Sequence, residues 1–481
     1  MRNRFSDNIF YGGAMFLDRC TGILVLPLLT KNLSPIEYGI WSQTLVYFGF
    51  ASVLLLFGFY HTISVIRSSI SSQQSSILYL LITSLFFILS LILTGLIIFF
   101  PSEAASFLYS DGGLHKLLFY ATAFVISETL YELVILGFIR SEDMIKRVSY
   151  FHTFKSIGRL LCIFLAVNLE NILLSIMLLN IILNIIICIW GYYIILDFRT
   201  VKKKNLLPNS ILIYNLKFSL ITNLSVFIGY LILMGNRFLI LHLEGIEANA
   251  LFSAHYAVIS LIGFIPMVLQ FTLLHHISSD FATNKDQSIK TTLEWSVHVY
   301  FLATIPISII LYIYYLPISN ILISNIYQTS SSFLIGLIIF FIILGFEQIV
   351  VYAAIATKDK FLWIARIIGA FFQVILALFF LKLTGLSSLP YILSLSSLIV
   401  CFWACIHLKG IISIYEFCNY VGYFLIPSSL TILIGTFAAN YIPGKNFVEV
   451  LFGSLLILVS FLVIEALRPS KKSHKVLTGI F

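Results

Sequence analysis

Two basic side chains inside an apolar stretch are the residues whose chemistry stands out in this sequence. Lys155 and Arg159 are four residues apart, so a helix over 147–168 places both on one face, with His152 a turn before Lys155. Cations in an apolar helix are costly and usually face a bundle interior or a watery cavity. An ammonium and a guanidinium side by side suit a phosphate-like anion, which the guanidinium binds through two parallel hydrogen bonds. The pair therefore predicts an anion-binding wall.

The depth of each cation in its apolar stretch separates a cavity role from snorkelling to the headgroups. Arg159 lies about a dozen residues into its stretch, roughly 18 Å along a helix, which is deep for a side chain to reach the surface. Arg19 lies similarly deep, and we expect both to line a cavity. For Lys217, which is shallower, the two interpretations stay equally open, and His152 is expected at the interface.

Acidic residues in the same part of the chain have two interpretations. Glu128 and Glu132 are four residues apart and share a helical face, while Asp18 adjoins Arg19 and points about 100° away from it. These carboxylates either pair with the buried cations or bind H⁺ or Na⁺ to couple a transport cycle. Glu347, alone in its apolar stretch, is another coupling candidate. No spacing of a metal site occurs, and no cofactor is expected.

Composition places these residues in a membrane protein. The chain has 481 residues, of which 60% are hydrophobic and 10% are charged, and its mean hydropathy is +1.02. Globular domains carry about 25% charged residues. The net charge of +8 is scattered over short connections, so nucleic-acid binding is not expected. The sequence predicts an all-α, polytopic membrane protein.

Apolar runs of about 20 residues, the length that crosses a bilayer as a helix, set the number of spans. Fourteen are predicted, and twelve is the alternative if two weak spans pair differently. The spans cover approximately 8–30, 38–61, 77–100, 115–139, 147–168, 171–196, 210–234, 248–274, 292–315, 331–357, 361–381, 387–408, 418–440 and 447–467.

Lys and Arg in the connections set the orientation. Of the 29 basic residues, nineteen lie at helix ends on the side of the N-terminus, five lie on the opposite side and five lie within spans. Because short cytoplasmic loops are rich in Lys and Arg, both termini are predicted to be cytoplasmic.

A weak internal repeat suggests two lobes. Residues 33–37 match residues 243–247 at three of five positions, at an offset of 210. Transporters often consist of repeats with the substrate site between them. We therefore predict a six-helix lobe over 1–200, a second over 201–410, and two extra helices with a basic tail over 411–481.

Two stretches resemble a known family. Residues 22–40, from Gly22 to Ile40, look like the opening of Wzx-type flippases for polysaccharide (O-antigen or capsule) repeat units, in the multidrug/oligosaccharidyl-lipid/polysaccharide exporter superfamily. Residues 235–241 are similar to the acid-Arg-apolar segment that ends the seventh span in that family. Here Asn236 stands in place of the acid, which puts a local ion pair with Arg237 in doubt.

The resemblance implies a V-shaped bundle in a bacterial inner membrane that works by alternating access. Its cargo would be an oligosaccharide on undecaprenyl pyrophosphate, moved from the cytoplasmic to the periplasmic leaflet, with polymerase and chain-length proteins as partners. Candidate anion contacts are then Arg19, Lys155, Arg159, Lys217 and Arg237.

The sequence leaves two other functions open. A polymerase, ligase or glycosyltransferase of the same pathway would need a large outer loop with catalytic residues, and the connections here are short. A drug or cation antiporter of the same superfamily would need an acidic cavity, whereas this one is predicted to be basic.

Overall fold

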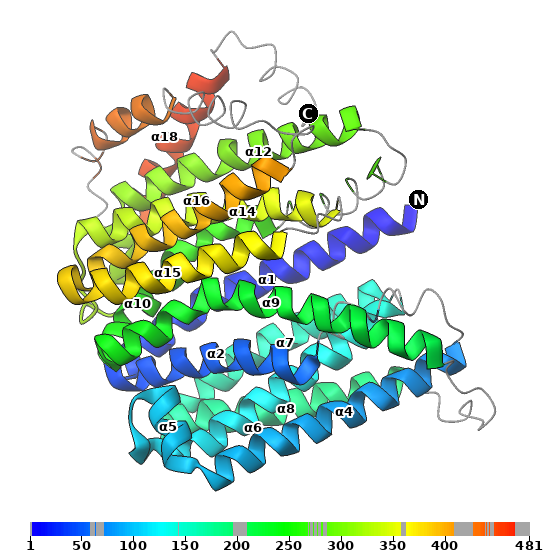
Figure 1. Ribbon diagram of the computed structural model, residues 1–481. Coiled ribbons are helices and arrows are strands. Elements are labelled where there is room, and N and C mark those ends of the chain that lie inside the picture. The colour runs from blue at the N-terminus through cyan, green and yellow to red at the C-terminus, as the bar shows by residue number, and fades with distance from the viewer. Residues whose placement is uncertain are drawn as a thin grey trace. The chain divides into compact units, whose positions relative to one another are not determined.

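The computed structural model describes residues 2–57, 72–142, 144–195, 209–267, 286–356, 362–407, 427–437 and 447–466, with isolated positions 63, 269, 273, 277, 280, 281, 439 and 442. Every regular element in this part of the chain is helical (Figure 1). The prediction of an all-α polytopic fold is confirmed. The chain forms two compact units, Met1–Leu251 and Phe252–Phe481.

The first unit contains the helices that carry the basic pair. Its elements are α1 (Arg2–Asn32), α2 (Pro35–Leu56), α4 (Ser72–Phe99), α5 (Pro101–Tyr109), η1 (Gly112–Leu114), α6 (His115–Tyr131), η2 (Glu132–Ile139), α7 (Ile145–Ala166), α8 (Ile172–Ile195), α9 (Asn209–Leu243) and the start of α10 (Ile246–Ile259).

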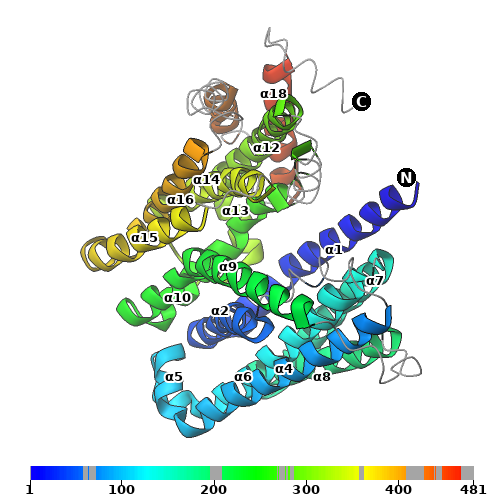
Figure 2. The same cartoon turned by 45° about the vertical axis from the view of Figure 1, so that its right-hand side comes forward.

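The second unit continues from α10. Its elements are η3 (Ser260–Gly263), α12 (Asp286–Ile313), α13 (Tyr315–Leu322), α14 (Ser331–Ala356), α15 (Leu362–Thr384), η4 (Gly385–Ser388), α16 (Leu389–His407), a helix over Pro427–Phe437 and α18 (Phe447–Ala466). In Figures 1 and 2, α14, α15 and α16 run side by side, and α16 packs on both α14 and α15.

Nine helices in the described ranges are long and apolar enough to cross a membrane. Each of the fourteen predicted spans overlaps a helix, although the predicted span 418–440 is described from residue 427 on. The span count of fourteen and the lobe borders near residues 200 and 410 stay predictions.

Local sequence sets the helix ends. Ser34 and Glu37 form a reciprocal capping box at the start of α2, where Pro35 occupies the first helical position. Short helices, α5 and α13, follow the predicted spans 77–100 and 292–315. The fourth span changes character midway, because α6 passes directly into the π-helix η2 at Glu132. Such wide turns often occur at functional sites.

Packing within the first unit places α7 between two neighbours. α1 packs along α7, and α8 packs against both α6 and α7. Polar residues of α1, α6, α7 and α8 are thereby brought together in the interior of one bundle. This is the arrangement that positions the predicted basic face.

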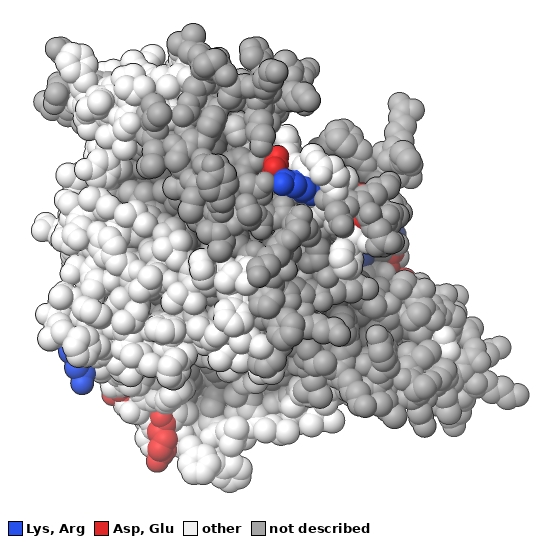
Figure 3. Space-filling model, turned by 45° about the horizontal axis from the view of Figure 1, so that its top comes forward, with Lys and Arg blue, Asp and Glu red and all other residues white. Residues whose placement is uncertain are grey.

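The described surface suits a lipid environment. Large apolar side chains are widely exposed, among them Leu91 (72%), Phe99 (80%) and Tyr193 (82%). On the face drawn in Figure 3, charged side chains are sparse on the described surface. Exposed apolar area on this scale marks contact with lipid or another apolar partner.

One close helix contact gives a stability prediction. A Cβ atom on Gly39 of α2 would lie 2.6 Å from the backbone oxygen of Ile246. Because a backbone atom cannot rotate away, Gly39→Val should lower the free energy of unfolding by about 1–3 kcal/mol. Thermal unfolding in detergent measures this against Gly95→Val, whose new side chain would have open space around its Cβ. Equal unfolding temperatures for the two variants would contradict the prediction.

Candidate functional site

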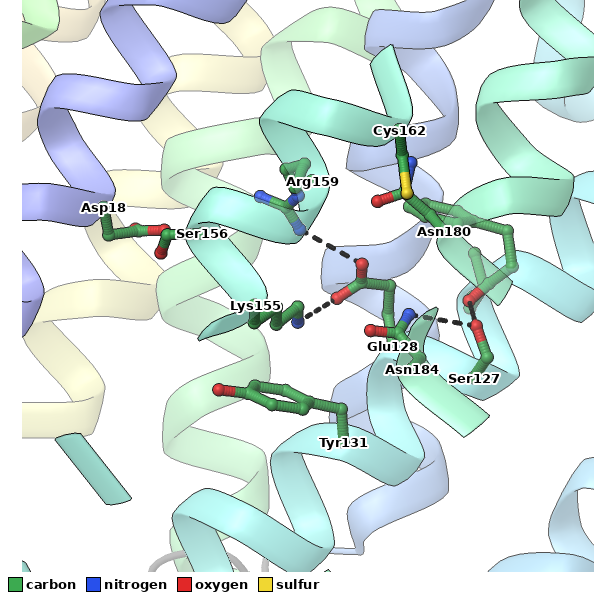
Figure 4. Close-up of polar contacts among 12 residues, drawn as sticks. Asp18, Ser127, Glu128, Tyr131, Lys155, Ser156, Arg159, Cys162, Asn180 and Asn184 are labelled. Carbon is green, nitrogen blue, oxygen red and sulfur yellow. Dashed lines mark hydrogen bonds and ion pairs between the residues drawn. The ribbon is translucent and has the colours of Figure 1, made fainter. Parts of the chain in front are cut away.

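A carboxylate between two cations forms the centre of the site. Lys155 Nζ donates to Glu128 Oε2 at 2.5 Å, and Arg159 donates through Nη2 to Glu128 Oε1 at 3.1 Å. Figure 4 shows Glu128 of α6 reaching between the two basic side chains of α7. We call Glu128, Lys155 and Arg159 the charge triad. One negative and two positive charges give it a net charge of about +1.

Lys155 is the enclosed member of the triad. Its side chain is 10% exposed and that of Glu128 is 2% exposed. The ammonium also lies 3.5 Å from the centre of the Tyr131 ring, on its face. A cation over an aromatic face is stabilised by the ring quadrupole, most strongly where water is excluded. A carboxylate and a ring thus take the place of water around this ammonium.

Arg159 is the accessible member. Its side chain is 35% exposed although it shares the same carboxylate. Arg159 is the fifteenth residue of α7, so it lies about 21 Å along the helix from Ile145. A guanidinium has five N–H donors in a planar fork, and the bond to Glu128 engages one Nη nitrogen. The other donors of the fork suit a second anion.

Side chains of α1 border the triad. Ser156 Oγ donates to Asp18 Oδ1 at 2.7 Å, and Asp18 Oδ2 lies 3.9 Å from His152 Nε2. The other ring nitrogen of His152 lies 3.2 Å from the Tyr131 hydroxyl. His152, expected at the interface, therefore belongs to the polar cluster between α1 and α6.

α8 closes the cluster on the other side. Asn184 Nδ2 donates to Ser127 Oγ at 3.2 Å, next to Glu128 in the chain. Asn180, one turn earlier, is also buried and bonds to the backbone oxygen of Ile176 at 2.8 Å. Four helices therefore surround the triad with polar groups (Figure 4).

The remaining predicted site residues in the first unit lie on three elements. Arg19 is half-buried beside Asp18 on α1. Glu132 is half-buried at the first residue of η2 and has no hydrogen bond or ion pair within the described part of the chain. Arg237 on α9 is buried next to Asn236. The side chain of Lys217, also on α9, lies outside the described residues.

Glu347 belongs to the second unit. It is buried on α14 and 5% exposed. Within the described part of the chain, its Oε2 atom has no hydrogen-bond partner. A buried carboxylate oxygen of this kind keeps Glu347 a candidate for ion coupling.

Sequence reasoning missed several members of the cluster. Ser156, Tyr131, Asn180 and Asn184 were not singled out, although a pair of asparagines four residues apart in an apolar span is a visible signal. Ser156 and Tyr131 carry no such signal. Their partners lie on other helices, and only tertiary packing identifies them.

A separate cavity in the second unit is apolar. It has a volume of about 520 Å³ and is lined by residues of α12, α14 and the helix over Pro427–Phe437, including Phe301, Ile338 and Ile432. No charged side chain is among its described lining residues. Such a cavity does not suit an anionic group.

Several solved transporter structures have the same fold. A lipid II flippase, MurJ, in an inward closed conformation matches 95% of this chain and 98% of its own at 16% identity, with a TM-score of 0.74. An inward-facing multidrug resistance MATE transporter of the MOP superfamily matches 83% of this chain and 95% of its own at 13% identity, with a TM-score of 0.67.

A third solved structure of this fold differs in the polarity of its binding pocket. It is a MOP-superfamily transporter from Pyrococcus furiosus whose binding pocket is described as having reversed polarity, and it matches 84% of this chain and 94% of its own at 13% identity, with a TM-score of 0.58. Searches of family models and of curated proteins gave no match. The chain has the fold of the MOP-superfamily transporters.

Proposed function

We propose that the chain is a flippase that moves an oligosaccharide linked to undecaprenyl pyrophosphate from the cytoplasmic to the periplasmic leaflet. The observation that carries the proposal is the charge triad, a net positive cluster deep in a bundle with a transporter fold. Pyrophosphate is an anion that an arginine fork binds through charge-assisted hydrogen bonds. Arg159 is the first contact we assign, with Arg19, Lys217 and Arg237 in support.

The lipid part of such a cargo requires no enclosed pocket. The apolar exposed surface of the helices allows a polyprenyl tail to stay in the bilayer while the polar head crosses through the bundle. One protein of the same fold is a lipid II flippase, which supports a lipid-linked substrate class. The cycle we propose is alternating access between two lobes in a bacterial inner membrane.

Ion coupling is assigned to carboxylates outside the triad. Both oxygens of Glu128 accept bonds from basic side chains, so a coupling ion would have to displace one of them. Glu132, Asp18 and Glu347 are the remaining candidates to take up H⁺ or Na⁺. No bond of the cargo is made or broken in this cycle.

The two rival functions fit the site less well. A cation antiporter of the same superfamily would need carboxylates that are open to a cation, whereas Glu128 is bound by two cations and Asp18, whose side chain is 35% exposed, accepts a hydrogen bond from Ser156. An enzyme of the same pathway would need an acid or base directed at the reacting bond, and Glu128 is held by two cations. Both interpretations therefore rank below a flippase.

Gene deletion in the native organism tests the proposal. We expect undecaprenyl-linked repeat units to accumulate with their saccharide accessible only from the cytoplasmic side, because chemistry before the flip continues. Enzymatic labelling of intact and permeabilised cells measures this accessibility, with the wild-type gene as the restoring control. Single repeat units exposed on the periplasmic side would point to a polymerase and overturn the proposal.

A further inference from the structure

We infer that Lys155 is a built-in counter-ion for Glu128 and does not touch the cargo. Its charge offsets the carboxylate, so that Arg159 presents the net positive charge of the triad. This inference rests on the proposed function, since it assigns different tasks to two cations that the sequence treats as equivalent anion contacts. Lys155 is then a positioning residue, and Arg159 is the residue that meets the pyrophosphate.

The net positive charge of the triad depends on Lys155. With Glu128 bound to both cations, the triad carries a net charge of about +1. Without Lys155, Glu128 and Arg159 would form a neutral pair, and an approaching anion would meet repulsion from the carboxylate as well as attraction from the guanidinium. The ammonium thus offsets the charge of the Glu128 carboxylate while it stays bound to it, and the positive charge of Arg159 remains for the anion.

Lys155 is more enclosed than Arg159. Lys155 is held between the Glu128 carboxylate and the Tyr131 ring, and its side chain is 10% exposed against 35% for Arg159. A cargo phosphate would have to displace one of these neighbours to reach the ammonium. The Arg159 side chain is less enclosed, and its bond to Glu128 engages Nη2.

Asp18 and Glu132 act on the cations of the triad through space, whereas Glu128 bonds to them directly. Asp18 accepts a hydrogen bond from Ser156 and lies 3.9 Å from the His152 ring. Glu132 lies one helical turn after Glu128, without a bond to either cation of the triad among the described residues. Direct contact with Arg159 therefore distinguishes Glu128 from an acid on the same helix.

Replacing Lys155 by a neutral residue, alone and together with Glu128, tests the assignment. In purified protein in nanodiscs, Lys155→Met should weaken binding of undecaprenyl pyrophosphate about tenfold, because the local net charge falls from +1 to zero. Lys155→Met combined with Glu128→Gln should return the affinity to within about threefold of wild type, since the net charge is +1 again and Gln still accepts a bond from Arg159. Transport in cells, normalised to membrane abundance, should follow the same order.

The matched control is Lys155→Met combined with Glu132→Gln. It removes a carboxylate of the same type from the same span without touching Arg159, so binding should stay as weak as in Lys155→Met. If the Glu128 pair fails to recover affinity while remaining folded by thermal unfolding, Lys155 itself contacts the cargo and the inference is wrong. Equal recovery in both double variants would also overturn it, because total charge alone would then explain binding.

Failure of the proposed function looks different. In that case wild-type protein would not bind undecaprenyl pyrophosphate, and Arg159→Ala would match wild type in both binding and transport. If wild type binds, Arg159→Ala does not, and the Glu128 pair stays weak, the flippase proposal stands and only the assignment of Lys155 falls.

Discussion

Replacing Arg159 by alanine is expected to lower transport about 10- to 100-fold, since charge-assisted hydrogen bonds are worth about 1.5–3 kcal/mol and about 1.4 kcal/mol is tenfold. Membrane abundance should stay near that of wild type, because Glu128 and Lys155 remain as a balanced pair. Surface polysaccharide per unit of membrane protein is the measurement. Arg159→Lys should retain part of the activity, as a point charge without the planar fork.

Arg147→Ala is the matched control for this variant. Arg147 lies on α7, three turns before Arg159, and is exposed. It contacts Met144 and lies away from the triad along the helix. Normal export by Arg159→Ala, or an equal loss in Arg147→Ala, would contradict a specific role for the Arg159 guanidinium.

Replacing Glu128 by leucine should cause the largest loss of stability among single changes in the cluster. The substitution leaves Lys155 and Arg159 as neighbouring cations, with the lysine enclosed and without its carboxylate. Breaking a buried ion pair by removing one partner costs about 3–5 kcal/mol. Thermal unfolding of detergent-purified protein should show a lower midpoint and a smaller folded yield.

A second substitution separates the charge effect from the change in shape. Glu128→Leu combined with Lys155→Met removes both members of the enclosed pair, and replacing a buried ion pair by apolar groups is often close to neutral. We expect the double variant to unfold at a higher temperature than Glu128→Leu alone. A double variant less stable than the single variant would contradict the prediction and show that the contact of the ammonium with the Tyr131 ring outweighs the loss of its carboxylate.

Helical periodicity predicted how the charged residues of each span lie relative to one another. The four-residue spacing of Lys155 and Arg159 placed them on one face of a helix, and the structure has them on α7 against one shared carboxylate. The spacing of Glu128 and Glu132 also placed two acids on one face. Both inferences depend on local geometry, which the helical repeat fixes.

Partner choice was not predictable, because it depends on how helices pack. The sequence does not distinguish Glu128 from Glu132 as the acid that meets the cations, yet Glu128 lies between them and Glu132 begins the π-helix η2. The change from α6 to η2 also has no counterpart in the apolar pattern of the span. Tertiary contacts decide such local departures, and propensity does not.

The contact between Asp18 and Ser156 illustrates the same limit. These residues are 138 positions apart, and their hydrogen bond exists because α1 packs along α7. No spacing rule links them. Polar residues in apolar spans can be recognised from the sequence, because burying them in an apolar setting costs free energy. Which of them bond to one another depends on how the helices pack.

Reconstitution tests the central claim most directly. Purified protein in vesicles that contain an undecaprenyl-pyrophosphate-linked oligosaccharide in the outer leaflet should move the saccharide out of reach of an added glycosidase, faster than protein-free vesicles do. Arg159→Ala protein, reconstituted at equal density, should be close to the protein-free rate. Translocation by wild type no faster than in protein-free vesicles, or equal rates for wild type and Arg159→Ala, would contradict a flippase that uses Arg159 to hold the anionic head group.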